Sequence, residues 1–294
     1  MANLKEIQTR IGSVKTTKQV TSAMKMVSAA KLKKAQDSIT RMRPYAEKLI
    51  YILSQLSEGL SGSESPYTDQ RPPENILIVL ASTNKGLCGG FNSNITKAAL
   101  EHAQTSYPYQ FEAGRVQFFV IGRQAVKLLK SRKIRTAKED DVLIEDLNFE
   151  GVSEMANELM TMFRNHQYDR VDVVYNKFIN AAVQEPTVEQ YLPIKEDIAK
   201  GLGEDHHLVS DFIFEPNKEE IVTNLIPQAL QTMLFKVLID SQAAEHGARM
   251  TAMTQATDNA TELIKDLTLT YNKVRQAAIT NQIIEVTGGA EALN

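Results

Sequence analysis

Long helix-type repeats of apolar residues at the two ends of this chain constrain its fold more than any other feature. From residue 4 onward, apolar side chains recur every three or four positions, as they do along one face of an α-helix. The members of this stripe are Leu4, Ile7, Ile11, Val14, Val20, Met24 and Val27. Neither glycine nor proline occurs between Ser13 and Arg43, so the pattern predicts one long N-terminal helix with a narrow seam.

Helix-breaking residues suggest where the two long helices bend and end. Pro44 should kink or divide the N-terminal helix, and Gly59 should end it. A second helix is predicted after Glu215-Pro216-Asn217, with Asn217 as its cap, and Gly288 and Gly289 should stop it. Pro227 is a further place where it could bend. Its stripe contains Ile226, Leu230, Met233, Val237, Ala244, Met250, Ala260, Ile264, Leu267, Tyr271, Val274 and Ala278.

Neither stripe can be buried by its own helix, so we expect the two helices to pair as an antiparallel coiled coil. The alternative is that both are ordinary domain helices, but such helices average only about 11–12 residues. At 1.5 Å per residue the C-terminal helix is longer than the N-terminal one by roughly 20 Å. The tip, residues 283–294, should therefore project alone.

The middle of the chain has a different periodicity. Residues 59–74 are rich in Gly, Ser and Pro, which predicts a mobile connection. Short apolar runs then predict strands at 75–82, 115–122, 171–178, 188–194 and 209–214, with helices at 94–103, 123–131 and 152–165. This alternation predicts a Rossmann-like α/β domain with a largely parallel sheet at 75–212, between coiled-coil segments at 1–58 and 217–294.

The overall composition excludes several classes of protein. Hydrophobic residues make up 43% of the 294 residues, charged residues 23%, and the net charge is −3, which is typical of a globular protein. Cys88 is the single cysteine, so an internal disulfide and a cysteine-based zinc cluster are excluded. No stretch approaches the roughly 20 apolar residues of a membrane span, and the N-terminus lacks the apolar segment of a secretion signal.

A glycine-rich segment, GLCGGFN at 86–92, lies between a predicted strand and a predicted helix, where glycines can hold a phosphate. Neither GxxxxGK[ST] nor GxGxxG is present, and Lys85 precedes the glycines, whereas the lysine of a Walker motif follows them. A tight turn that needs positive φ or close approach is the favoured interpretation. We therefore expect no nucleotide or other cofactor here.

The remaining polar residues do not suggest an active site. The five histidines, including the His206-His207 pair, show no metal-ligand spacing. The acidic pairs Asp140-Asp141 and Glu219-Glu220 lie in segments that we expect to be solvated. The sequence shows neither a GxSxG motif nor a Ser/His/Asp arrangement. We expect no catalytic residue and no metal site.

The N-terminal helix is strongly basic. Residues 1–36 contain eight Lys or Arg residues and the single acid Glu6, a net charge of about +7. This face could follow nucleic-acid phosphates, meet acidic loops of a protein partner, or be solvated without a partner. The segment lacks aromatic residues and has no arginine beyond Arg10, which disfavours nucleic-acid recognition.

Three segments in this order resemble the γ subunit family of F-type ATP synthases. They are LKEIQTRIGSVKTTKQVTSAMKMVSAAKLKKAQ at 4–36, GLCGGFN at 86–92 and EHGARMTAMTQATDNATELIKDLTLTYNKVRQAAIT at 245–280. The similarity extends over essentially the whole chain. It implies a non-catalytic rotor that turns inside a hexamer of α and β subunits, with an α/β foot joined to the ε subunit and the membrane c-ring.

The resemblance also implies which residues touch the hexamer. The basic stretch around Met24, Lys25 and Lys31 would pass acidic loops of β, which carries the catalysis, while the tip would sit in an apolar sleeve. The other expected contact residues are Lys85, Arg249, Arg275, Gln276, Thr280 and Glu285. Gln282 stands where the family usually has an acid, so a salt bridge there is not expected.

The resemblance further implies a bacterial protein attached peripherally to the cytoplasmic side of the inner membrane, with no nucleic-acid partner. Two other functions stay open on the sequence alone. The first is a nucleotide- or phosphate-binding α/β enzyme with helical extensions. The second is a coiled-coil protein that binds nucleic acid or acts as a scaffold.

Overall fold

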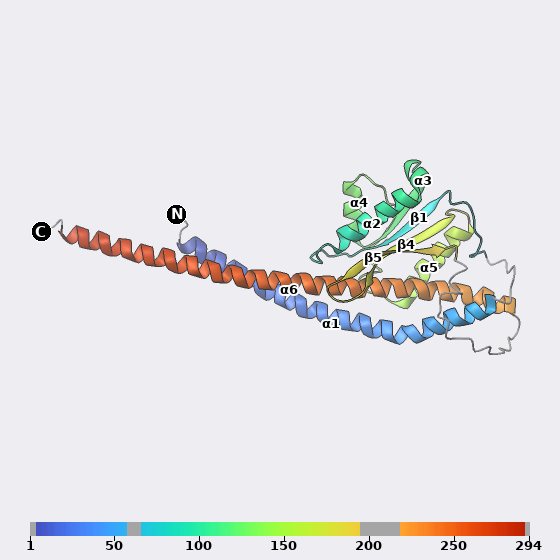
Figure 1. Ribbon diagram of the computed structural model, residues 1–294, viewed down its shortest axis with the longest axis horizontal. Coiled ribbons are helices and arrows are strands. Elements are labelled where there is room, and N and C mark those ends of the chain that lie inside the picture. Colours follow the sequence, from blue (N-terminus) through green and yellow to red (C-terminus); the bar gives the residue numbers. More distant parts are fainter. Residues whose placement is uncertain (1–3, 58–65, 195–217, 292–294) are drawn as a thin grey trace. The chain divides into compact units, whose positions relative to one another are not determined.

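A computed structural model describes residues 4–57, 66–194 and 218–291 (Figure 1). Two long helices, α1 (Leu4–Ser57) and α6 (Lys218–Glu291), precede and follow a mixed α/β region. The chain divides into two compact units. We call residues 1–29 with 249–294 the coiled-coil unit, and residues 30–248 the α/β unit.

The α/β unit is built on a five-stranded sheet with the order β3-β2-β1-β4-β5. Its strands are β1 (Ile76–Ala81), β2 (Val116–Ile121), β3 (Lys138–Asp140), β4 (Arg170–Phe178) and β5 (Gln184–Leu192). All neighbouring strands are parallel except β4 and β5, which form an antiparallel pair at one edge. Every residue of β1 is buried, because helices cover both faces of a parallel sheet. The predicted Rossmann-like architecture is confirmed.

Four shorter helices surround the described part of this sheet: α2 (Phe91–Ser106), α3 (Pro108–Glu112), α4 (Arg123–Ser131) and α5 (Phe149–Arg164). Side chains of α2 and α4 pack on one face, while α5 and the first part of α6 pack on the other. Asn148 caps α5, since its Oδ1 accepts a hydrogen bond of 2.8 Å from the Gly151 amide.

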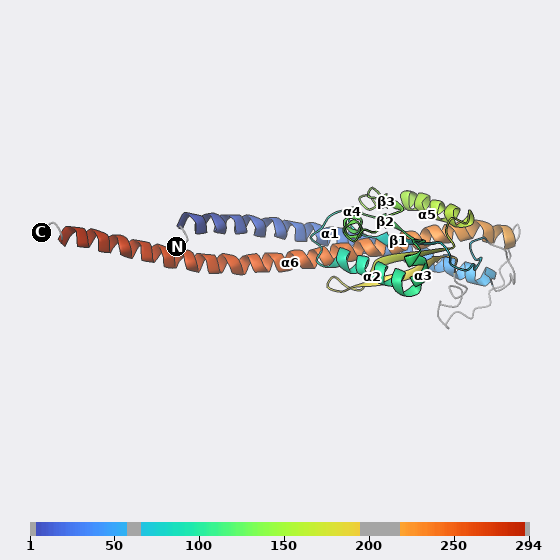
Figure 2. The ribbon, with the colours of Figure 1, turned by 90° about the horizontal axis from the view of Figure 1, so that it is seen from above.

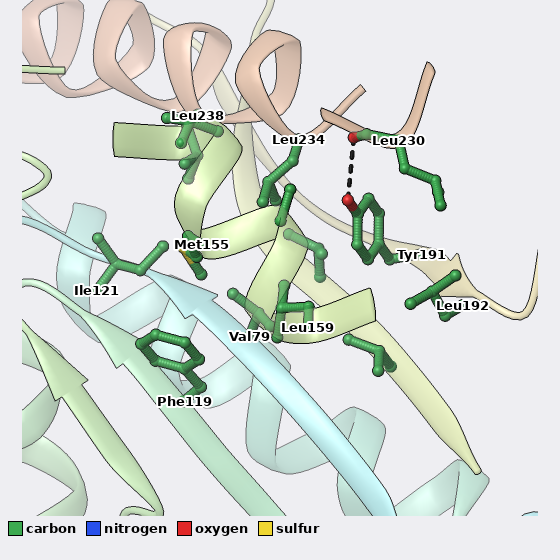
Figure 3. Packing of buried hydrophobic residues seen from close by; sticks show 14 of the residues in the cluster. Val79, Phe119, Ile121, Met155, Leu159, Tyr191, Leu192, Leu230, Leu234 and Leu238 are labelled. Atoms are coloured by element: carbon green, nitrogen blue, oxygen red, sulfur yellow. Dashed lines mark hydrogen bonds between the residues drawn. The ribbon is translucent and has the colours of Figure 1, made fainter. Parts of the chain in front are cut away.

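The first part of α6 belongs to the core of the α/β unit. Leu230, Leu234 and Leu238 are buried against α5 and the sheet (Figure 3). The Tyr191 hydroxyl at the end of β5 donates a hydrogen bond of 3.0 Å to the Leu230 carbonyl. Of the stripe predicted for the C-terminal helix, Ile226 and Leu230 lie in this core. Leu234 and Leu238 are buried in place of the predicted Met233 and Val237, which are half-buried.

Several local expectations need correction. Helix α1 is not divided at Pro44, so of the two outcomes expected there only a kink stays a prediction, and α6 continues through Gly288 and Gly289 to Glu291. A glycine costs a helix only about 1 kcal/mol, and the loss at Pro44 is offset where Ala46 and Leu49 are buried. The short elements α3 and β3 were not expected. The strand expected at 209–214 and the Asn217 cap lie outside the described residues, as do Gly59 and His206-His207.

Part of the segment expected to be mobile is ordered by polar contacts with the α/β unit. The Tyr67 carbonyl accepts a hydrogen bond of 2.9 Å from the Ile194 amide, and the Pro73 carbonyl accepts one of 2.8 Å from Gln110. Arg71 lies over the Phe163 ring and donates to the Phe163 carbonyl. Residues 66–74 are therefore fixed to the sheet and its helices, whereas residues 58–65 lie outside the description.

In the coiled-coil unit, the N-terminal part of α1 and the C-terminal part of α6 run side by side in opposite directions (Figures 1 and 2). The inward positions of α6 repeat every seven residues, as in a coiled coil. They are Met253, Thr257, Ala260, Ile264, Leu267, Tyr271, Val274 and Ala278, all buried or half-buried. The predicted antiparallel coiled coil is confirmed.

The seam of α1 differs from its predicted stripe at two positions. Val20 and Val27 are 53% and 58% exposed, while the neighbouring Thr21 and Ser28 are buried. Together with Ile7 and Val14, which is half-buried, these small polar residues keep an exact seven-residue spacing. The heptad geometry therefore prevails over residue polarity at this point.

Candidate functional site

The glycine turn connects β1 to α2 and is closed by internal contacts. Leu87 and Gly89 adopt positive φ angles of 63° and 59°. The Thr83 amide donates to Asn92 Oδ1 at 3.1 Å, and Asn92 Nδ2 donates to Thr83 Oγ1 at 2.9 Å. These bonds tie the end of β1 to the first turn of α2. The glycines thus form the tight turn favoured by the sequence.

Ligands of doubly wound sheets bind outside the carboxyl ends of the strands where the strand order reverses, which here is between β1 and β4. In this chain Cys88 and Phe91, which follow β1, pack there with Phe178 at the end of β4. Ala244 and Ala248 of α6 complete the cluster. The usual nucleotide position is therefore filled by the protein's own apolar side chains.

The start of α4, on the same edge of the sheet, is also closed. Its first backbone amides, at Arg123, Gln124 and Ala125, donate to Asn84 Oδ1, the Thr83 carbonyl and Ser82 Oγ, respectively, at 3.0–3.2 Å. A helix N-terminus binds a phosphate through such amides when they are free. Here they bond to the loop after β1, which does not favour the nucleotide-binding alternative.

A buried polar cluster that the sequence analysis missed lies between α2, α3 and β4. His102 Nε2 is 2.7 Å from Asp172 Oδ2, the Tyr107 hydroxyl donates to the same oxygen at 2.6 Å, and Arg170 donates to Oδ1 at 3.2 Å. Ser106 Oγ is 3.1 Å from His102 Nδ1. No motif relates Asp172 to its three partners, since His102 and Tyr107 are 70 and 65 residues away in sequence. The packing of α2 against the sheet brings these residues together.

The ionisation of this cluster suits a structural role. Burial pushes the pKa of Asp172 up, but the hydrogen bonds from His102 and Tyr107 and the charge of Arg170 outweigh burial and hold that pKa below its usual 3.8. Burial and the Asp172 carboxylate raise the pKa of Tyr107, so its hydroxyl stays a donor. Ser106 is in the last turn of α2, where helix carbonyls would repel an oxyanion. The Ser-His-Asp order therefore does not form a hydrolytic site.

The expected contact residues of α1 are accessible. Lys25 and Lys31 are exposed, and neither forms an ion pair with a described residue. Met24 is half-buried beside the seam. Val20, Met26 and Val27 add large exposed apolar groups to the same segment. Such a mixture of unpaired cations and exposed apolar groups on a thin coil is typical of a surface covered by a partner.

The expected contact residues of α6 divide into two sets. Arg275, Gln276, Thr280 and Glu285 are exposed, and the Thr280 hydroxyl donates to the Gln276 carbonyl at 3.0 Å. Arg249 is only 8% exposed. Any contact of Arg249 with a partner would therefore use a small part of its side chain.

The end of α6 is an apolar helix surface beyond the coiled coil. Thr21 lies opposite Thr257, so Leu4 is level with about residue 274, and α6 extends past it by about 25 Å at 1.5 Å per residue. This overhang is close to the one expected from helix lengths. It carries the exposed side chains Ile279, Ile283, Ile284 and Val286.

Lys85 belongs to the α/β unit and follows β1, on the carboxyl edge of the sheet. It is exposed, as is Leu87 at 66%. Val142, which follows β3, and Ile179 and Val183, between β4 and β5, are also exposed on this edge. The α/β unit thus has an apolar rim of its own that includes the outer side of the glycine turn.

Comparison with known proteins decides the family. A family model described as ATP synthase matches residues 3–293. The ATP synthase gamma chain of Christiangramia forsetii is 50% identical over the full length of both chains. That of Flavobacterium psychrophilum is 51% identical over 100% of this chain and 99% of its own. The chain belongs to the ATP synthase gamma chain family.

Solved structures support the fold of this gamma chain. A chain of the Euglena gracilis mitochondrial ATP synthase superposes with a TM-score of 0.66 at 19% identity, covering 99% of this chain and 94% of that one. A chain of the central stalk and c-ring structure from Tetrahymena thermophila gives a TM-score of 0.58 at 21% identity, with coverages of 81% and 99%.

Family membership agrees with the closed glycine turn, because gamma chains are non-catalytic subunits. No described helix combines the length and the apolar character needed to cross a bilayer. Among the described residues, no group of three or more His, Cys, Asp or Glu side chains is placed to hold a metal ion.

Proposed function

We propose that this chain is the central-stalk rotor of an F-type ATP synthase and couples ion flow through a membrane c-ring to ATP synthesis and hydrolysis in catalytic β subunits. The observation that carries the proposal is the surface of the coiled-coil unit. Two helices alone leave Val20, Val27, Ile283 and Val286 exposed, and burying such side chains contributes about 1.5–3 kcal/mol each. An enclosing partner supplies this burial.

The basic face of α1 is suited to acidic loops of the β subunits. Lys25 and Lys31 are exposed and unpaired within the described chain, so both are available for ion pairs. Exposed ion pairs of this kind contribute little affinity but fix orientation and partner choice. Met24 adds an adaptable apolar contact beside them.

The end of α6 is suited to an apolar sleeve formed by the hexamer. Ile279, Ile283 and Val286 lie at i, i+4 and i+7, on one face of the helix. Arg275, Gln276, Thr280 and Glu285 provide polar contacts near the entrance. Gln282 in place of an acid keeps hydrogen bonding but removes one charge.

The proposed mechanism is mechanical. When the rotor turns, each β subunit meets in succession a different side of an asymmetric coil, whose one face is basic and whose end is a single apolar helix. Each contact shifts the equilibrium between the conformations of a β subunit by the difference between its contact energies with those conformations. Successive contacts would therefore drive open and closed nucleotide sites in order.

The α/β unit would form the foot of the rotor, in contact with the ε subunit and the c-ring. Its exposed rim, with Lys85 and Leu87, is assigned to the hexamer. This arrangement places the chain on the cytoplasmic side of a bacterial inner membrane as a peripheral subunit. The full-length similarity to bacterial gamma chains supports this placement.

The test is to co-express the chain with α and β subunits of the same source and to purify the complex with and without it. We expect a stable hexamer with one copy of the chain and ATPase activity that depends on it. Reversal of charge in Lys25→Glu/Lys31→Glu should impair this activity, whereas Lys127→Glu, at an exposed site on α4, should not. A chain that stays monomeric with α and β present would overturn the proposal.

A further inference from the structure

Helix α6 makes an unusually close contact with the loop between β4 and β5. Gly247 is buried there, and a Cβ atom added to it would lie 3.2 Å from Ala181 Cα and 3.2 Å from Phe178 Cε2. Both distances are shorter than ordinary van der Waals contact. The backbone of α6 thus rests directly on the β4–β5 loop, and any larger side chain would push the two apart.

The loop itself is stiffened by hydrogen bonds. Asn180 Oδ1 accepts from the amides of both Ala182 and Val183 at 2.9 Å, and the Asn180 amide donates to the Val183 carbonyl at 3.2 Å. This Asx-type turn holds the loop in one conformation. Ala181, in its middle, is therefore a firm support for Gly247.

A hydrogen bond joins the end of β4 to α6 about two helical turns before Gly247. The Phe178 amide at the end of β4 donates to Asp240 Oδ2 at 3.2 Å. Burial raises the pKa of Asp240, although the Phe178 amide and the charges of Lys177 and Lys236 counteract it. Because burial disfavours the charged form, an uncharged side chain with an oxygen acceptor is suited to position 240.

A second anchor of α6 lies nearer its start, where Leu230 is buried in the core and its carbonyl accepts from Tyr191. Leu230 and Gly247 are seventeen residues apart, about 25 Å along a helix. Two contacts at this separation resist tilting and twisting of α6 against the sheet better than one. Gly247 also lies at the end of the α/β unit, which stops at Ala248, because α6 belongs to the coiled-coil unit from Arg249 onward.

We propose that the contact of the β4–β5 loop with Gly247, together with the Phe178–Asp240 hydrogen bond, is the joint that passes torque between the sheet of the α/β unit and α6. The inference rests on the proposed rotor function. The chain also links β5 to α6 covalently, so loosening this joint lowers the torsional stiffness of the rotor and does not disconnect it. Apolar side-chain packing alone is non-directional, whereas backbone contact and a directed hydrogen bond resist rotation.

The experiment measures torsional stiffness in the assembled complex. The hexamer is fixed to a surface, a bead is attached to the α/β unit through Lys127→Cys on α4, and stiffness is obtained from the angular fluctuations of the bead between steps. Gly247→Val, which pushes the loop away, and Asp240→Ala, which removes the acceptor, should each lower stiffness at least about twofold. The rate of ATP hydrolysis should stay unchanged, because the hexamer contacts are intact.

Two control variants separate the joint from general damage. Asp240→Asn keeps an oxygen acceptor and should keep the stiffness of the parent chain. Gln228→Val adds a β-branched residue at an exposed site of α6 and should leave the stiffness unchanged. If Gly247→Val does not assemble, Asp240→Ala decides. If Asp240→Ala has the stiffness of the parent chain, the proposed joint is wrong, but the proposed rotor function is not affected. A parent complex that hydrolyses ATP without rotating overturns the rotor function itself.

Discussion

Thr21 on α1 and Thr257 on α6 bring their hydroxyl oxygens to 2.9 Å from each other across the seam of the coiled-coil unit. Each hydroxyl is also within reach of a carbonyl of its own helix, Lys18 at 3.1 Å and Met253 at 2.7 Å. A polar pair in a largely apolar seam favours one register, since a shifted pairing would bury a hydroxyl opposite an apolar residue. This pair therefore fixes how far α6 extends past α1.

The first prediction concerns this register. Thr21→Val removes one hydroxyl and should destabilise the pairing of the helices by about 1 kcal/mol, because Thr257 loses a partner in the seam. The double change Thr21→Val/Thr257→Val should be close to neutral, since both polar groups are replaced by apolar ones of the same shape. Hydrogen exchange of backbone amides in residues 4–29 of the full chain checks this. Equal protection loss in the single and double variants would show that the pair does not matter.

The second prediction separates seam from surface in α1. Ile7→Ala should lower the stability of the coiled-coil unit by about 2 kcal/mol, because Ile7 is buried in the seam. Val20→Ala should change it by less than about 0.5 kcal/mol, because Val20 is more than half exposed. The measurement is urea unfolding of the isolated full chain followed by circular dichroism. A larger loss at Val20 than at Ile7 would contradict the assigned seam.

The third prediction concerns pH and Asp172, which is 1% exposed. Its pKa in the folded protein lies below the usual 3.8, so its ionised form stabilises the fold. That stabilisation is fully present above the unfolded pKa and is lost as pH falls through the lower folded value. Asp172→Asn should cost about 2 kcal/mol at neutral pH, because charged hydrogen bonds to His102, Tyr107 and Arg170 are weakened.

The pH dependence gives this prediction its control. The difference in unfolding free energy between Asp172→Asn and the parent chain should shrink as pH drops below 3.8, because the parent carboxylate then becomes neutral as well. Thermal unfolding of both chains at a series of pH values checks this. A difference that stays constant down to pH values well below the folded pKa would mean that the Asp172 charge contributes nothing.

The fourth prediction concerns the overhanging end of α6. Ile283→Asp should change the stability of the isolated chain by less than about 0.5 kcal/mol, because Ile283 is 58% exposed. In the complex, the same change should reduce ATPase activity or the amount of chain retained on the hexamer, since a buried unpaired carboxylate is costly. Gln228→Asp, which introduces the same residue at an exposed site of α6 outside the overhang, is the matched control. Equal retention and activity of both variants would rule out an apolar sleeve.

The sequence was sufficient for the architecture because its signals are strong and repetitive. The helix stripes extend far beyond an average helix, and β1 is an unbroken apolar run between turn residues, so both the coil and the parallel sheet could be predicted. Short elements could not. Helix α3 has five residues and β3 three, too few for a period to be visible.

Other features could not be predicted because they depend on tertiary contacts. Val20 and Val27 continue the apolar stripe of α1, yet the heptad register set by α6 places Thr21 and Ser28 in the seam. The partners of Asp172 lie on α2, between α2 and α3, and on β4, and only folding brings them together. Gly288 and Gly289 look like a stop signal, but a glycine pair weakens a helix without ending it. The expected contacts with a hexamer stay predictions.

The decisive experiment for the rotor function is to observe rotation in a reconstituted complex. The complex of this chain with α and β subunits is fixed through the hexamer, and a bead on exposed Lys127→Cys of the α/β unit is followed under the microscope while ATP is supplied. The rotor function predicts that the bead rotates in one direction, that its speed rises with ATP concentration, and that rotation stops when an inhibitor of the β sites is added. ATP hydrolysis by the same complex with a stationary bead would contradict it.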